Sequence, residues 1–429
     1  MKIRTLVGSL AFAGLIVPGI ASATDGYFSH GYGMKAAGMG GAALAIADDA
    51  MGGANNPASM VFAGDRLDLG LTIFSPHRGA SRTGSCGAGY PCNAYGAGAF
   101  DNSTNSGSNY FYVPELGYNH MLASNMSVGV TIYGNGGMNT DYPGGTDAGG
   151  NANMLGGSTG LGVDLEQLII APTFAYKFNA NNAIGIAPLF GYQTFAASGL
   201  QGFSNYSSSP SNLTNNGHDT STGWGVRVGW MGKITDRLSL GAAYASKMDM
   251  SSFNKYQGLF ADGGKFDIPE NYGVGLAYKI TPQALVALDY MRINYSQVGS
   301  IGDQSTSVLF AGTKLGASGG PGFGWSDVNV WKLGFQYALN DQWTLRAGYN
   351  HSDNPIQATN VVFNILAPGV VQDHYTLGAT YNLSKSSQLT AAYMHAMQNS
   401  VTGPDPVFGG TDTIKMYEDS FGVAYDVKF

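Results

Sequence analysis

Apolar and polar side chains alternate along much of this chain. In the final stretch, residues 421–429, every odd position is apolar or aromatic and every even position is small or charged. Because successive side chains on a strand point to opposite faces, this segment has one apolar and one polar face. The same alternation recurs at residues 224–231, 272–280, 331–339, 343–350 and 375–383. The pattern predicts many amphipathic strands.

The alternation alone does not decide whether the apolar face meets lipid or, as in a soluble β-sandwich, another sheet. Trp and Tyr lie near both ends of the apolar rows, as the aromatic girdles of a membrane barrel require. A Lys or Arg on the lipid face near the bilayer midplane would cost about 2–4 kcal/mol. The alternation instead predicts that the cations lie on the polar face: Arg227, Lys247, Lys332, Arg346 and Lys428. This sorting favours a barrel in lipid.

The connections between the apolar rows alternate in length. Short ones fall at residues 179–182, 235–237, 281–283 and 384–386, and long ones at 75–109, 134–164, 196–221, 296–326 and 398–415. This asymmetry suits periplasmic turns and extracellular loops. We therefore predict an all-β fold, a transmembrane antiparallel β-barrel of about 14 strands over residues 64–429.

Composition agrees with a barrel and excludes other classes. Charged residues make up 11% and aromatic residues 12% of the chain, and 64 residues are glycine. After the first 23 residues there is no apolar run of roughly 18 residues, which a helical span needs. The net charge of -7 argues against a nucleic-acid partner. We expect no metal and no cofactor.

Residues 1–23 read as a secretory signal peptide. Lys2 and Arg4 precede an apolar stretch at residues 6–20, and Ala21-Ser22-Ala23 is a small-residue cleavage site. We expect the mature chain to begin at Thr24 and to reside in the bacterial outer membrane.

Residues 24–63 do not alternate. They contain few charges and many Gly and Ala residues, with a helix-favouring stretch at residues 42–51. A disordered tail would be polar and charged, whereas this composition suits close packing. We predict that residues 24–63 form a plug, or hatch, inside the barrel.

The two cysteines, Cys86 and Cys92, lie in a Gly-, Ser- and Asn-rich segment. In an oxidising, exported setting they are expected to form a local disulfide in a surface loop. Free thiols are the alternative.

The aromatic, Gly-rich start, Asp48-Asp49-Ala50, and the Asn56-Pro57-Ala58 motif before a barrel ending at Phe429 resemble the FadL family over the whole mature chain. That family consists of outer-membrane transporters of long-chain fatty acids and aromatic hydrocarbons. The resemblance implies a hatch, a fourteen-stranded barrel, and a sideways opening at a kink in the third strand. Here that strand is residues 126–133, which run into Gly134, Gly136 and Gly137. An ordinary glycine-rich loop is the alternative for these glycines.

A transporter of hydrophobic solutes needs an apolar pocket. We expect the ligand to contact the hatch at Tyr27, Phe28, Tyr32 and Met34, and the outer loops at Met154, Leu155, Leu161, Leu259 and Phe260. Simple loop packing is the alternative for the loop residues. A fatty acid would also need a cation, for which Lys255, Lys265, Lys314 and Arg292 are candidates.

We predict uptake of a hydrophobic small molecule by a channel that is not an enzyme. The expected surroundings are outer-membrane lipid, lipopolysaccharide and the barrel assembly machinery, and the expected state is a monomer. A polar-solute porin and a surface adhesin are the rival functions. Catalysis is disfavoured because the seven histidines are scattered and no nucleophile-elbow or zinc-helix motif occurs.

Overall fold

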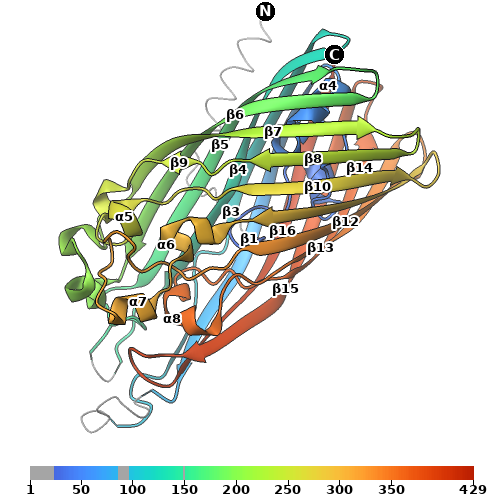
Figure 1. Cartoon of the computed structure of the whole chain (residues 1–429). Coiled ribbons are helices and arrows are strands. Elements are labelled where there is room, and N and C mark those ends of the chain that lie inside the picture. The colour runs from blue at the N-terminus through green and yellow to red at the C-terminus, as the bar shows by residue number, and fades with distance from the viewer. Residues whose placement is uncertain (1–23, 86–95, 148–149) are drawn as a thin grey trace, which may run out of the picture.

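The structure, a computed structural model, describes residues 24–85, 96–147 and 150–429. One antiparallel sheet closes into a fourteen-stranded barrel, because β16 pairs with β1 along the whole of β1 (Figure 1). The barrel strands are β1 (Arg66–Thr83), β3 (Phe111–Ala123), β4 (Met126–Tyr142), β5 (Leu161–Lys177), β6 (Asn182–Ser198), β7 (Asp219–Lys233), β8 (Leu238–Ala245), β10 (Asn271–Lys279), β11 (Ala284–Ile293), β12 (Val328–Ala338), β13 (Trp343–Ser352), β14 (Asp373–Asn382), β15 (Ser387–Pro404) and β16 (Thr411–Lys428). Two short strands, β2 (Asn102–Asn105) and β9 (Asp249–Met250), pair with β1 and β7. The predicted fold is confirmed.

Helices are short and occupy two places. One group belongs to the segment inside the barrel: α2 (Met34–Ala37), α3 (Gly52–Asn55), η1 (Pro57–Ser59) and α4 (Met60–Ala63). The other group lies in the connections at one end of the cylinder: η2 (Gln201–Tyr206), η3 (Pro210–Asn212), η4 (Asn254–Tyr256), α5 (Ala261–Gly264), η5 (Tyr295–Gln297), α6 (Gly299–Gly302), α7 (Thr306–Phe310), η6 (Ala358–Asn360) and α8 (Val361–Asn364) (Figure 1). Among the helices of the described ranges, none has the length and apolarity needed to cross a membrane.

The two faces of the barrel wall differ as the alternation predicts. Along β16 the odd positions from 421 to 425 are exposed on the outer face, and the even positions from 422 to 424 are buried inside. Arg227, Lys332 and Arg346 point inward and are buried. The prediction was wrong for Lys247, which lies beyond the end of β8 and is exposed. Lys428 is on the same face of β16 as Gly422 and Ala424, as predicted, but it is exposed because it lies at the end of the strand.

Several strands extend further than the sequence predicts. β1 continues to Thr83, β4 to Tyr142 and β15 to Pro404, although long loops were expected from residues 75, 134 and 398. A ladder needs only backbone pairing, and a strand that projects beyond the bilayer has no lipid-facing apolar row. The hydrophobic pattern therefore locates the part of each strand that faces lipid and misses the rest.

Residues 24–63 lie in the barrel interior. Most of their side chains are buried, and their backbone is bound by inward-facing side chains of the wall. The N–H groups of Ala43 and Leu44, for example, donate to one carboxylate oxygen of Asp289 at 2.7 and 2.9 Å. The helix favoured at residues 42–51 is absent, since that stretch forms turns and bends. Partners on the wall, rather than the i−4 carbonyls of a helix, satisfy these donors.

Inward-facing glycines let this segment approach the wall closely. A Cβ on Gly348 would lie 2.1 Å from the nitrogen of Gly40, and one on Gly241 would lie 1.9 Å from the carbonyl oxygen of Leu44. Such separations are far below van der Waals contact, so any side chain would displace the segment. The high glycine content thus has a packing role at these positions.

Gly348→Ala is predicted to loosen residues 24–63 while the barrel stays folded. The added methyl group overpacks the contact with Gly40, which costs about 1–3 kcal/mol. Limited proteolysis should cleave residues 24–63 faster in this variant. The matched control is Gly145→Ala, because nothing lies within 4 Å of a Cβ at Gly145. Equal cleavage of the two variants would contradict the packing role.

Candidate functional site

The Asn56-Pro57-Ala58 motif fixes one end of the inner segment to the wall. The Asn56 amide donates to the carbonyl oxygens of Leu44, at 2.8 Å, and of Trp230 on β7, at 2.9 Å. Its Oδ1 accepts from the N–H of Ala58 at 3.1 Å and so caps η1. Pro57 occupies the first position of η1, where no N–H is needed. The motif therefore joins two parts of the inner segment to β7.

The barrel wall is incompletely paired between β3 and β4. Pairing of these strands stops at Glu115 and Tyr133, whereas β4 continues to Tyr142 against β5. A register shift in the β4–β5 ladder falls between Gly134 and Gly136. Beyond Tyr133 the edge of β4 that faces β3 thus lacks a strand partner.

Residues 27–29 bind this free edge of β4. The contacts are a β-bridge between Phe28 and Gly136, a 3.1 Å hydrogen bond from Ser29 N to Asn135 O, and a 3.2 Å hydrogen bond from Gly137 N to Tyr27 O. The inner segment therefore satisfies backbone groups that β3 leaves unpaired.

Two side chains, Tyr295 of η5 and Lys332 of β12, hold this part of the inner segment. The Tyr295 hydroxyl donates to the carbonyl oxygen of Asp25 and accepts from the N–H of Tyr27 at 3.1 Å. Lys332 donates to the carbonyl oxygen of His30 at 2.7 Å and lies 3.6 Å from the Asp25 carboxylate. Burial raises the pKa of Asp25 to about 6, although Lys332 acts to lower it. Burial, with Lys332, lowers the pKa of His30 to about 4, so this imidazole is neutral at pH 7.

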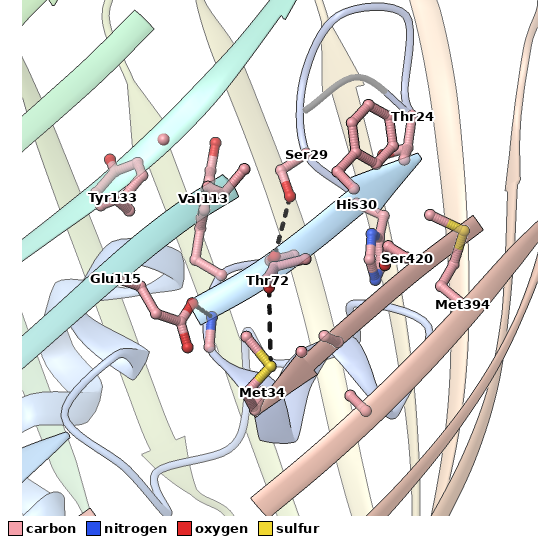
Figure 2. Close-up of a pocket in the computed structure, with 18 of the residues that line it drawn as sticks. Thr24, Ser29, His30, Met34, Thr72, Val113, Glu115, Tyr133, Met394 and Ser420 are labelled. Atoms are coloured by element: carbon pink, nitrogen blue, oxygen red, sulfur yellow. Dashed lines mark hydrogen bonds between the residues drawn. The ribbon is translucent and has the colours of Figure 1, made fainter. Parts of the chain in front are cut away.

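A cavity of about 620 Å³ lies beside the unpaired region (Figure 2). Val113 and Glu115 of β3, Tyr133 of β4, and Tyr32 and Met34 of the inner segment line it. Glu115 also accepts a hydrogen bond from the N–H of Gly33 at 3.1 Å. Two of the predicted hatch residues therefore face this cavity, which we call the gate cavity.

Tyr27 and Phe28 face two other cavities. Tyr27 lines one of about 360 Å³, the aromatic cavity, together with Phe74, Phe111 and Trp325. Phe28 lines a cavity of about 560 Å³ that also contains Arg227 and Lys332. The four predicted hatch residues thus lie on neighbouring cavities rather than on one.

An apolar cavity of about 490 Å³, the outer cavity, lies among the outer loops. Of the predicted loop residues, Leu155, Leu259 and Phe260 line it, with Phe195, Phe203, Phe323 and Phe363 among the other lining residues. Met154 and Leu161 are buried but do not line it, and Leu161 begins β5 instead of lying in a loop.

The cations expected in the outer loops do not line any of these four cavities. Lys265 pairs with Asp249 at 2.7 Å, Arg292 pairs with Asp327 at 2.9 Å, Lys255 donates to the carbonyl oxygen of His218, and Lys314 is exposed. Sequence reasoning missed the contacts that Glu115, Tyr295 and Lys332 make with the inner segment, because these contacts join positions far apart in the chain. The predicted signal peptide at residues 1–23, Cys86 and Cys92 lie outside the described residues.

This arrangement defines a class: an outer-membrane barrel whose lumen is filled by its own N-terminal segment. The sequence matches the outer membrane protein transport family (OMPP1/FadL/TodX) over residues 29–416. The chain belongs to that family and is an outer-membrane protein.

Solved structures share the fold. The toluene transporter TodX of Pseudomonas putida is 19% identical, with a TM-score of 0.68 over 95% of this chain and 100% of that one. A FadL homologue of Pseudomonas aeruginosa is 16% identical, with a TM-score of 0.66 over 94% of this chain and 100% of that one. The toluene transporter TbuX of Ralstonia pickettii is 17% identical, with a TM-score of 0.61 over 93% of this chain and 99% of that one.

The match to a curated relative covers a smaller part of the chain. The putative outer membrane protein NMB0088 of Neisseria meningitidis serogroup B is 23% identical over 243 residues. The match spans 48% of this chain and 51% of that protein.

Phe260→Asp is predicted to weaken binding of an apolar fluorescent probe by about tenfold or more, because it puts a charge in the apolar outer cavity. Titration of the detergent-purified protein measures this. Phe310→Asp is the control, since Phe310 is exposed on α7. Equal probe affinity in both variants would exclude the outer cavity as the binding site.

Proposed function

We propose that this protein takes up hydrophobic small molecules across the outer membrane by diffusion through a hatch-gated opening in the barrel wall. One observation carries the proposal: residues 27–29 bind the edge of β4 that β3 leaves unpaired, beside the gate cavity. Their movement would open a route from the lumen to the bilayer. A hydrophobic solute leaving by this route avoids the aqueous periplasm.

The cavities suggest the order of events. The outer cavity is walled by aliphatic and aromatic side chains, and it supports capture of an apolar solute from outside. The aromatic cavity comes next, because it adjoins the outer cavity. Its lining residues Trp325 and Ala367 are near neighbours in the chain of Phe323 and Leu366, which line the outer cavity. The gate cavity shares Phe74 with the aromatic cavity and follows it. The solute then passes between β3 and β4.

Gating requires that the solute favour the displaced state of residues 27–29 over the bound state. Tyr27 and Phe28 have large apolar surfaces, and Tyr27 lies in the aromatic cavity itself. A solute in that cavity would compete with the contacts of the Tyr27 ring. The centroid of this ring lies 5.3 Å from that of Tyr295 and 6.0 Å from that of Trp325. Loss of these contacts would free the edge of β4.

The solute class is the one named for related proteins. TodX and TbuX are toluene transporters, and the Pseudomonas aeruginosa protein is a FadL homologue. We extend hydrophobic uptake, of hydrocarbons or long-chain fatty acids, to this chain. A polar-solute porin would need an open lumen, whereas residues 24–63 occupy this one. No described contact favours the adhesin alternative.

The proposal includes the setting of the barrel. Its exposed apolar outer face, seen at residues 421–425, would contact membrane lipid and lipopolysaccharide. We also propose that residues 1–23 are removed, that the barrel assembly machinery inserts the chain into the membrane, and that the protein acts as a monomer.

The test is a covalent lock between Phe28→Cys and Gly136→Cys, with Cys86 and Cys92 replaced by Ser. Bridged residues on antiparallel backbones are about 4.5–5.5 Å apart at Cα, within the range that a disulfide needs. Oxidation should abolish uptake of a labelled hydrophobic solute, and reduction should restore it. Each single cysteine variant is a control. Undiminished uptake by the oxidised double variant would rule out this opening.

A further inference from the structure

Most polar side chains that line the gate cavity already have partners within the protein. The Ser29 hydroxyl donates to the carbonyl oxygen of Gly31 at 3.2 Å. The Tyr32 hydroxyl donates to Oδ1 of Asn135 at 3.0 Å. These groups need no ligand to satisfy them.

The His30 imidazole is different. It lines the gate cavity together with Met394 of β15 and Ser420 of β16 (Figure 2). Only 5% of His30 is exposed, and its Nε2 has no hydrogen-bond partner among the described residues. A buried polar atom without a partner is costly, so this ring nitrogen needs an explanation.

The backbone of His30 is held in place from two sides. Its carbonyl oxygen accepts a hydrogen bond from Lys332 at 2.7 Å. The same oxygen packs against Gly41 so closely that a Cβ at Gly41 would overlap it. The ring therefore has a fixed position at the cavity wall, which lowers the entropy cost of binding a ligand there.

Glu115 has the other unpartnered buried oxygen among the residues that line this cavity. One of its carboxyl oxygens, Oε2, accepts from the N–H of Gly33 at 3.1 Å. The other, Oε1, packs against the wall, since a Cβ at Gly70 would lie 2.5 Å from it. The Glu115 carboxyl is thus directed at the protein, and His30 is the group available to a solute.

The charge of the cavity selects the kind of polar group that can pair with His30. With a pKa of about 4, lowered by burial and by Lys332, the imidazole is neutral at pH 7. No Lys or Arg is among the described residues that line the cavity, and Glu115 is, so an anion is disfavoured. A hydroxyl group both donates and accepts, and it can therefore pair with Nε2 in either tautomer of the neutral ring.

We propose that Nε2 of His30 forms a hydrogen bond with the hydroxyl group of a neutral apolar solute, a phenol or a long-chain alcohol, held in the gate cavity. This rests on the proposed function and names a class of solute that leaves through the same opening. A hydrocarbon would fill the cavity but leave the ring nitrogen unpaired. The site therefore retains a hydroxyl compound more strongly than the hydrocarbon of the same shape.

The rest of the cavity fits the apolar body of such a solute. Met34, Phe74, Val113 and Met394 line it, and they combine a flat ring with side chains that adapt to different shapes. Tyr133, where the pairing of β3 with β4 ends, lines it too. A solute bound to His30 thus lies next to the proposed opening. Aryl and alkyl hydroxyl compounds share the polar group, and the experiment separates them.

Equilibrium binding of four radiolabelled probes to the full-length protein, purified in an amine-oxide detergent without hydroxyl groups, tests the proposal. The aryl pair is 2-naphthol and 2-methylnaphthalene, and the alkyl pair is 1-dodecanol and tridecane. In each pair a methyl group replaces the hydroxyl. His30→Phe removes the ring nitrogens, and His30→Gln keeps a polar group of similar reach. His218→Phe is the matched control, because the His218 side chain is 60% exposed and lines none of the four cavities. A change in gel migration on heating shows that each variant is folded.

His30→Phe is expected to weaken binding of at least one hydroxyl probe about tenfold and to change binding of its methyl analogue less than about twofold. His30→Gln should retain most of the preference for the hydroxyl probe, and His218→Phe should match the parent. The pair that responds identifies an aryl or an alkyl body. Equal losses for both members of a pair, or an unchanged hydroxyl preference in His30→Phe, would overturn the assignment and leave a water molecule as the partner of Nε2.

A crystal of the parent protein soaked in 6-bromo-2-naphthol locates the site. The anomalous signal of bromine is expected in the gate cavity, and a signal confined to the other cavities would overturn the assignment. If the parent binds 2-methylnaphthalene or tridecane but neither hydroxyl probe, only this inference fails. If the parent binds none of the four probes, the proposed function fails too.

Discussion

Backbone pairing inside the bilayer is the constraint on which the whole structure depends. A lipid-facing N–H or C=O without a partner costs several kcal/mol, so the sheet must close, and β16 does close it on β1. Between β3 and β4 the pairing stops early, at Glu115 and Tyr133. Residues 27–29 supply the missing partner to β4. The inner segment is therefore also part of the wall, and the place where it replaces a strand is the place where we propose that the wall opens.

The same segment explains why the interior is glycine-rich and polar at once. Gly241 and Gly348 admit its backbone, and Asp289 and Asn56 satisfy its donors and acceptors. Such contacts fix a path with little regular secondary structure, since the donors are directed at the wall. A segment held in this way can be released over a few residues at one end while Asn56 keeps the other end in place. The geometry therefore suits local movement better than expulsion of the whole hatch.

The sequence predicted the fold because lipid enforces a period of two on each strand. The alternation at residues 421–425 and the inward position of Arg227 follow directly from that rule. It does not apply beyond the bilayer, so the outer parts of β1 and β4 were read as loops. The path of residues 42–51 was also missed, because the N–H groups of Ala43 and Leu44 bind Asp289, which is distant in sequence.

A sealed lumen is the central claim, and conductance in planar lipid bilayers tests it most directly. With residues 24–63 seated and residues 27–29 paired to β4, the purified full-length protein should pass no large steady ionic current. A large, constant conductance from the intact chain would mean that the lumen is an open aqueous pore and would contradict the hatch.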